Sequence, residues 1–177
     1  MPALVRTACH DDLTAVQGVE VAAGALFATV GMGAIAEDDP PSLEELADYQ
    51  RGGRAWVSVD DRDVPVGYLL VDVVDGNAHV EQVTVHPAHA RSGRGRELLD
   101  VAEAWAAASG RTALTLTTFA DVAWNAPYYR RLGFRDMTPD EVGDELRAVR
   151  AREAAHGLDV WPRVSMVRPV RAASPSH

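Results

Sequence analysis

The sequence contains no lysine, and all 17 of its basic residues are arginine, against 26 acidic residues and a net charge of −9. This acidic balance disfavours nucleic acid as a partner, because neutralising phosphates requires a basic face. Only one cysteine is present, Cys9, so an internal disulfide and a cysteine-based metal cluster are both excluded. We therefore expect no metal site.

Long hydrophobic runs are also lacking. The longest apolar stretches lie near Val71–Val74 and Val101–Ala108, well short of the roughly 20 residues that a membrane span requires. The first six residues lack the pattern of a signal peptide. We therefore expect a cytoplasmic protein with no membrane partner. With 177 residues and 47% hydrophobic content, we predict one domain over 1–171 and a disordered tail at 172–177.

Hydrophobic spacing and turn residues predict alternating strands and helices, which is typical of an α/β fold. Strands are expected at Leu4–Thr7, Ala55–Val59, Val66–Val73, Ala78–Val85, Thr112–Phe119, from Phe134 onward, and at Trp161–Val170. Helices are expected after Asp11 or Asp12, from Ser42 to about Gln50, over Arg96–Ser109, from Asn125 to Gly133, and from Thr138 to about Ala155. Ser42 and Glu45 have the spacing of a capping box.

The segment Val83–Arg96 combines a strand, a proline-stopped turn, a Gly-x-Gly loop and the start of a helix. Gly93 and Gly95 allow the backbone to approach a phosphate closely, and the amides at a helix N-terminus attract anions. Three arginines in the loop could add charge-assisted bonds: Arg91, Arg94 and Arg96. The alternative is a tight turn with solvated arginines. A dinucleotide fingerprint does not fit, because Leu98 stands where its third glycine belongs.

The segments Val83–Gly95 and Tyr128–Phe134 each contain a motif, and together these motifs resemble those of the GNAT family of N-acetyltransferases. The first reads Val83-Thr84-Val85-His86-Pro87, then Arg91-Ser92-Gly93-Arg94-Gly95, and resembles the family's acetyl-CoA motif. Arg91 stands one place nearer the glycines than the corresponding residue of the family pattern, which would align with Ala90. The second, Tyr128-Tyr129-Arg130-Arg131-Leu132-Gly133-Phe134, resembles the family's Tyr-x-x-x-Gly-Phe. The order of elements fits the family over nearly the whole chain.

The resemblance implies a mixed, twisted sheet of six or seven strands flanked by helices, with the fourth and fifth strands splayed. It also implies acetyl-CoA as co-substrate, with pantetheine on the backbone of Val83 and Val85 and the pyrophosphate on the loop amides. The residues implied to bind CoA are Val83, Thr84, Val85, Arg91, Ser92, Gly93, Arg94, Gly95, Arg96 and Asn125. Asn125 is either a CoA ligand or a helix cap, because strict alignment places Val122 at the family's asparagine.

Acetyl transfer needs a neutral amine, a donor for the oxyanion and an acid for the leaving thiolate. The resemblance assigns the acid to Tyr129, whose phenol is protonated at neutral pH. The neighbouring Tyr128 is expected to pack or to contact the acceptor. Candidate bases are His79 and Glu81, which share one side of their strand; a chain of water molecules is the alternative.

The implied acceptor is a primary amine on a small molecule or a peptide. Acidic residues in the region that would face it are either a rim that steers a cationic amine or an ordinary solvated loop: Glu37, Asp38, Asp39, Glu44 and Glu45. The alternative function is a non-catalytic sensor that binds acyl-CoA. Dimers are common in the family, so a homodimer is compatible with the resemblance.

Overall fold

The structure is a computed structural model that describes residues 4–171, so the predicted tail at 172–177 lies outside the described part. The strands are β1 (Leu4–Thr7), β2 (Ala55–Val59), β3 (Pro65–Val74), β4 (Asn77–Val85), β5 (Ala113–Phe119), β6 (Arg135–Asp136) and β7 (Arg163–Pro169). The α-helices are α1 (Leu13–Gly24), α2 (Gly33–Ala36), α3 (Leu43–Arg51), α4 (Arg94–Ala108), α5 (Ala126–Arg131) and α6 (Asp144–Ala155). Short 3-10 turns are η1 (His10–Asp12), η2 (Ala25–Val30), η3 (Pro87–His89), η4 (Pro139–Glu141) and η5 (Leu158–Val160).

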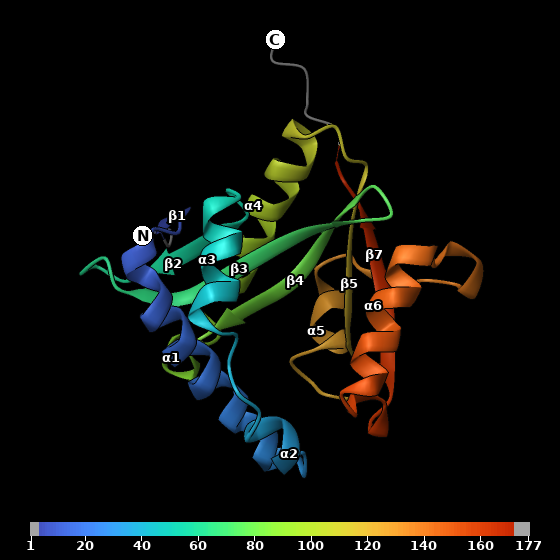
Figure 1. Cartoon of the computed structure of the whole chain (residues 1–177), viewed down its shortest axis with the longest axis horizontal. Helices are drawn as coiled ribbons and strands as arrows, with labels where there is room; N and C mark the ends of the chain where they lie inside the picture. Colours follow the sequence, from blue (N-terminus) through green and yellow to red (C-terminus); the bar gives the residue numbers. More distant parts are fainter. Residues whose placement is uncertain (1–3, 172–177) are drawn as a thin grey trace. The chain divides into compact units, whose positions relative to one another are not determined.

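Seven strands of the described chain form one mixed sheet in the order β1-β2-β3-β4-β5-β7-β6, which confirms the predicted fold class (Figure 1). The pairs β1–β2, β2–β3, β5–β7 and β6–β7 are antiparallel. β4 and β5 are parallel and pair at their amino ends, Ala78 with Leu114 and His79 with Thr115. A parallel pair requires a long crossover, and here the chain between them contains the loop and α4.

The chain divides into two compact units, which are described separately. Unit 1 comprises the residues up to Val71 together with Gln82–Val101. Its core joins three residues of α1, spaced three apart and each at most 3% exposed, to the inner faces of the strands: Leu13, Val16 and Val19. Figure 1 shows α1 and α3 next to each other over the first strands, and Leu46 of α3 enters the same core. The predicted capping box of Ser42 and Glu45 starts α3.

Unit 2 comprises Asp72–Glu81 and the residues from Ala102 onward. β5 and β7 pair along their whole length, from Ala113 with Pro169 to Phe119 with Arg163. α6 runs beside β7 (Figure 1) and buries Leu146 and Val149 against Val74 of β3.

A carboxylate distant in sequence caps α6. Asp75, in the turn after β3, accepts the backbone N–H groups of Glu145 and Leu146, both at 3.0 Å. The Glu145 carboxylate accepts the Asp75 N–H in return at 2.6 Å. A Cβ at Gly143, the residue before α6, would collide with this carboxyl group, so a larger residue there would displace the Asp75 cap.

The prediction of one helix from Thr138 to Ala155 is wrong. Thr138 and Glu141 do form a capping box, but it starts only the η4 turn. Val142 is extended, with φ −78° and ψ 110°, and α6 begins anew at Asp144. Several other boundaries differ by smaller amounts, among them β7, which spans Arg163–Pro169 instead of Trp161–Val170. α4 begins at Arg94, two residues earlier than predicted, and helical structure near the N-terminus already begins at His10.

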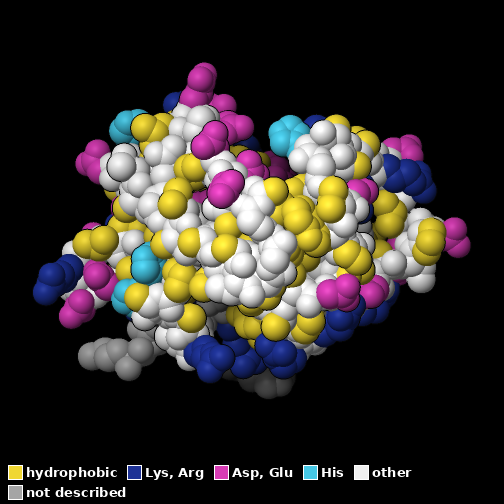
Figure 2. Space-filling model, turned by 90° about the horizontal axis from the view of Figure 1, so that it is seen from below, with side chains coloured by type: hydrophobic (Ala, Val, Ile, Leu, Met, Phe, Trp, Pro, Cys, Tyr) yellow, Lys and Arg dark blue, Asp and Glu magenta, His cyan; other side chains and the backbone are white. Residues whose placement is uncertain are grey.

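The stretch His10–Val30 is continuously helical, 21 residues long, and by length and composition is apolar enough to cross a membrane. The expectation that the longest apolar stretches lie near Val71–Val74 and Val101–Ala108 is therefore wrong, because Glu20 is the only charged residue between Leu13 and Val30. Its buried apolar residues Leu13, Val16 and Val19 lie in the core of unit 1, whereas Val21 and Val30 are 54% and 47% exposed. Apolar side chains are also visible at the surface in Figure 2.

Candidate functional site

The loop before α4 belongs to unit 1 and has the backbone that a phosphate site requires. Arg91 and Gly93 both have positive φ, 59° and 81°, and α4 starts at the next residue, Arg94. No atom lies within 4 Å of the position that a Cβ on Gly93 would take. The first N–H groups of a helix have no partner inside the helix. The loop therefore presents exposed backbone and a positive helix end together.

The arginine side chains of this loop differ in their exposure and in their hydrogen-bond partners. Arg94 donates from Nη1 to the hydroxyl of Ser58 at 2.8 Å and to the carbonyl of Val59 at 2.9 Å. Its guanidinium is thus engaged on β2, which leaves its backbone N–H for a ligand. The side chains of Arg91 and Arg96 are exposed at the surface.

The carboxyl-terminal half of β4, also in unit 1, carries a polar cluster against α1. The hydroxyl of Tyr68 donates to Oε2 of Glu20 at 2.6 Å, and the hydroxyl of Thr84 donates to the same oxygen at 3.1 Å. Gln82 donates to Thr84 at 2.8 Å and lies 3.4 Å from both Glu20 oxygens. Sequence reasoning missed Glu20 and Tyr68. The available signal was that Glu20 is the only charged residue between Asp12 and Glu37.

His79 and Glu81, the two predicted bases, lie in unit 2 and have different surroundings. Only 2% of the His79 side chain is exposed, and its Nδ1 lies 2.9 Å from the hydroxyl of Thr115. Burial lowers the pKa of His79, against the opposing effect of Asp72 and Glu153, so its imidazole is neutral at pH 7. The Glu81 side chain is 44% exposed and lies 3.8 Å from Nε2 of His79.

Lost hydration raises the pKa of Glu81 to about 7, and the negative charges of Asp72 and Glu153 add to the shift. The nearby cations Arg152 and Arg163 oppose it without cancelling it. A carboxyl group that is half ionised near neutrality and still accessible has the properties of a general base.

Glu153 of α6 is held by several donors in unit 2. Its carboxylate pairs with Arg150 at 2.8 Å and with Arg163 at 3.2 Å, and it accepts a hydrogen bond from Thr117 of β5. Asp159 pairs with Arg150 at 3.1 Å. The two arginines are thus balanced by two carboxylates.

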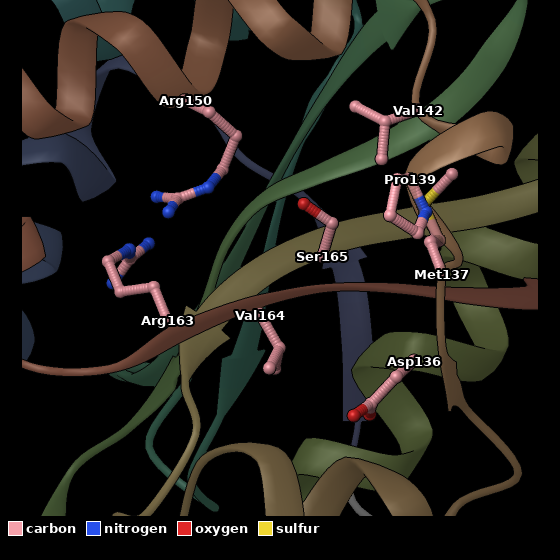
Figure 3. Close-up of a pocket in the computed structure, with 8 residues that line it drawn as sticks. All are labelled: Asp136, Met137, Pro139, Val142, Arg150, Arg163, Val164 and Ser165. Carbon is pink, nitrogen blue, oxygen red and sulfur yellow. The ribbon is translucent and has the colours of Figure 1, made fainter.

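A hollow of about 260 Å³ lies beside this network, lined by Asp136, Met137, Pro139, Val142, Arg150, Arg163, Val164 and Ser165. In Figure 3 the two arginines approach each other at one end, Val142, Pro139 and Met137 gather at the other, and Ser165 stands between. Both arginines at this hollow already have carboxylate partners.

Tyr129 is 8% exposed and lies on α5 in unit 2. Its ring packs edge-on against Phe134 and Tyr128, with centroids 5.9 and 5.4 Å away. Tyr128 is less buried and lies under the guanidinium of Arg131. Packing on several sides fixes the Tyr129 ring and hence the place of its hydroxyl.

Asn125 precedes α5 but makes no side-chain cap to it. Its Nδ2 donates to the carbonyl of Trp124 at 3.2 Å, and its Oδ1 is buried with no hydrogen-bond partner among the described residues. An unsatisfied buried acceptor is costly unless a ligand or water meets it. The side chain therefore does not act as the helix cap that was one of its two predicted roles.

The predicted site residues fall in both units. Unit 1 holds β4 from Gln82 and the loop to Arg96; unit 2 holds His79, Glu81, Asn125 and Tyr129. No group of three or more His, Cys, Asp or Glu in residues 4–171 is arranged to hold a metal ion.

Comparison with known proteins identifies the class. Residues 26–134 match the model of the Acetyltransferase (GNAT) family, and the chain belongs to that family. The protein is therefore an enzyme of the acetyltransferase class, as the two motifs predicted.

Solved structures share the fold at low identity. An acetyltransferase of the GNAT family from Staphylococcus aureus Mu50 has a TM-score of 0.71 and 14% identity, over 96% of this chain and all of its own. The ribosomal-protein-S18-alanine N-acetyltransferase from Escherichia coli has a TM-score of 0.65 and 19% identity, over 99% of each chain. The PaiA N-acetyltransferase from Thermoplasma acidophilum, solved in complex with coenzyme A, has a TM-score of 0.66 and 16% identity, over 96% of this chain and 99% of its own.

Proposed function

We propose that this enzyme transfers an acetyl group directly from acetyl-CoA to a primary amine of a small molecule or peptide. The loop before α4 is the observation that carries the proposal. It combines a left-handed Gly93, open space where a Cβ would stand, and the first N–H groups of a 15-residue helix. A pyrophosphate fits these features, with the exposed side chains of Arg91 and Arg96 as additional donors.

The remaining contacts to CoA follow from the same segment. The backbone of Val83 and Val85 would pair with the pantetheine arm as an added strand does. In unit 2, the unsatisfied Oδ1 of Asn125 is suited to accept an N–H from CoA. Because the Asn125 side chain does not cap α5, we assign it the other of its two predicted roles, the binding of CoA.

The chemistry needs one base and one acid. In the proposed reaction the amine nitrogen attacks the thioester carbonyl, the C–S bond breaks, and the sulfur leaves as a thiol. Tyr129 would give its proton to the departing sulfur, and the amine proton would pass to Glu81. Glu81 is favoured over His79 because its side chain is 44% exposed and its pKa is about 7, whereas His79 is enclosed.

Two experiments test this proposal. In calorimetry acetyl-CoA should bind, whereas NAD and ATP at equal concentration should not. Thiol release from acetyl-CoA should then depend on added primary amine. Absence of acetyl-CoA binding would overturn the proposal; binding without transfer to any amine would point to a sensor.

We also propose that the enzyme acts in the cytoplasm. Leu13, Val16 and Val19 support this because they pack in the core of unit 1, whereas only 17% of the apolar window within His10–Val30 is buried. Recovery of the protein in the membrane fraction after cell lysis would contradict it.

A further inference from the structure

The pairing of β2 with β3 in unit 1 contains an irregularity. Ser58 of β2 lies opposite Gly67 of β3, whereas the next residue, Val59, lies opposite Pro65. The register thus skips Val66, which is the extra residue of a β-bulge. Bulges bend a strand and re-aim its side chains, and they occur often beside active sites. The neighbours of this bulge are therefore of interest for the function.

The bulge contacts the beginning of the phosphate loop, by which we mean residues 86–93 between β4 and α4. The carbonyl of the bulged residue, Val66, accepts the N–H of His86 at 2.8 Å. His86 is the first residue after β4. Beside the bulge, Cδ1 of Leu98 lies 3.4 Å from the position that a Cβ on Gly67 would take. Both elements that the phosphate loop connects, β4 and α4, are therefore packed directly on this part of β3.

Arg94 ties the other end of the phosphate loop to the same bulge. It is the first residue of α4, and its Nη1 donates to the Ser58 hydroxyl at 2.8 Å and to the Val59 carbonyl at 2.9 Å. Ser58 and Val59 are the two residues between which the register shifts. Ser58 is fully buried, and Nε of Arg94 is buried as well. The guanidinium is thus directed into the protein, toward β2.

The backbone between these two attachments has a conformation that benefits from support. Arg91 and Gly93 both have positive φ, and a residue with a side chain adopts such a conformation only at a cost. When a binding conformation is populated only in part, the apparent affinity falls by the same fraction. Fixing both ends of the phosphate loop therefore strengthens phosphate binding without any contact to the ligand.

We propose that Arg94 is a positioning residue for the cofactor: its side chain, bound at the bulge of β2 and β3, fixes the phosphate loop in the conformation that binds acetyl-CoA. This inference rests on the proposed function, which assigns the pyrophosphate to that loop. Arg91 and Arg96, whose side chains are exposed, donate to phosphate directly, whereas Arg94 acts through the backbone. Two competing roles for Arg94 are a direct bond from its guanidinium to a phosphate and a contribution to folding stability alone.

Calorimetry of acetyl-CoA with Arg94→Met tests the inference. This change keeps an unbranched side chain and removes the donors to β2. The Kd for acetyl-CoA should rise by about tenfold, which corresponds to a loop that holds the binding conformation for about one-tenth of the time. The KM for acetyl-CoA should rise with it, while kcat at saturation should change by less than about twofold. Arg94→Lys, which keeps a donor, should recover part of the affinity.

Ser58→Ala separates the positioning role from the two competing roles. Ser58 is fully buried, so its hydroxyl acts on the cofactor only through Arg94. Its removal should raise the Kd by about threefold or more, and the double variant should bind no more weakly than Arg94→Met alone. If Arg94 bonded to a phosphate, Ser58→Ala would leave the Kd unchanged or lower it. If Arg94 served stability alone, both variants would lower Tm with an unchanged Kd. Either result would overturn the inference.

Arg51→Met is the matched control. The Arg51 side chain is 63% exposed on α3, also in unit 1, and its replacement removes the same charge without touching the bulge. The Kd for acetyl-CoA should stay at the wild-type value. A loss equal to that of Arg94→Met would show that only the net charge matters, and the inference would then be wrong.

Failure of the proposed function can be recognised separately. If the wild-type protein binds acetyl-CoA but acetylates no amine, the same calorimetry still decides the role of Arg94. If it does not bind acetyl-CoA, the proposed function and the inference both fail, whereas equal Kd values for wild type and Arg94→Met refute the inference alone. Hydrogen exchange of the ligand-free protein adds a check that needs no cofactor. The N–H groups of His89 and Glu97, which bond to the His86 and Gly93 carbonyls, should exchange faster in Arg94→Met than in Arg51→Met, and equal rates would contradict the inference.

Discussion

The pKa of Glu81 gives a quantitative prediction about the pH dependence of acetyl transfer. Burial raises this pKa from 4.5 to about 7, with Asp72 and Glu153 adding to the shift. A base with this pKa is about one-tenth ionised one unit below it and about nine-tenths ionised one unit above it. The contribution of Glu81 to kcat/KM should therefore grow by about tenfold between roughly pH 6 and pH 8.

Glu81→Gln isolates this contribution. The acceptor amine also loses its proton as pH rises, which increases the rate of both enzymes alike. The ratio of wild-type to variant kcat/KM, measured by thiol release with one amine, cancels that effect. We expect the ratio to rise with a midpoint near pH 7 and then to level off.

Other outcomes have distinct meanings. A ratio that does not change with pH would refute the assignment of Glu81 as the base. If the rise of kcat/KM with pH persisted in Glu81→Gln but disappeared in His79→Gln, and its midpoint lay below pH 6.5, His79 would be the base. A midpoint below 6.5 is expected for His79 because burial lowers its pKa.

The raised pKa of Glu81 also makes the stability of the folded protein depend on pH. Because the folded pKa of Glu81 is raised, its contribution to stability is present in full below about pH 4.5 and is lost as pH rises through about 7. The melting temperature of Glu81→Gln relative to wild type should therefore increase across that interval. A difference that decreased over the same interval would contradict this reasoning.

Three further predictions concern the loop, the acid and the cap of α6. Gly93→Asp places a negative charge and a strained left-handed residue at the phosphate position. Calorimetry should therefore show acetyl-CoA binding weakened by more than about 1.4 kcal/mol, or tenfold. Unchanged affinity in a folded variant would show that the loop is only a turn and does not bind the phosphates. Tyr129→Phe keeps the packed ring, so kcat should fall by about 10²–10⁴-fold with little change in acetyl-CoA binding, whereas Tyr128→Phe should cost much less; full turnover in Tyr129→Phe would exclude it as the acid. Asp75→Ala removes both hydrogen bonds to the start of α6 and should destabilise the protein by about 1–2 kcal/mol, seen as a drop of about 2–8 °C in Tm; an unchanged Tm would show that the cap contributes nothing.

Local signals predicted much of the fold. The strands Leu4–Thr7 and Ala55–Val59 have the predicted bounds, and the Ser42–Glu45 box starts α3, because alternation and capping depend only on neighbours in sequence. The break before α6 was not predictable in this way. It depends on Asp75, about 70 residues earlier, whose carboxylate provides a cap that the local sequence does not contain.

The candidate site also depends on contacts between residues that are distant in sequence. Alternation placed His79 and Glu81 on one side of a strand, but only tertiary packing makes one 2% and the other 44% exposed. Glu20 accepts hydrogen bonds from hydroxyls 48 and 64 residues away in sequence, so no pattern around α1 could reveal its partners. Asn125 occupied a cap position in sequence, yet its side chain bonds to Trp124 instead.

Acetyl transfer itself is the most direct test of the account. Purified protein is mixed with acetyl-CoA and each of a panel of primary amines, and both free thiol and the mass of the amine are followed over time. The account predicts equal amounts of thiol and singly acetylated amine, formed at a rate proportional to enzyme and strongly reduced in Tyr129→Phe. Thiol release without acetylated amine, or no release with any primary amine despite bound acetyl-CoA, would contradict it.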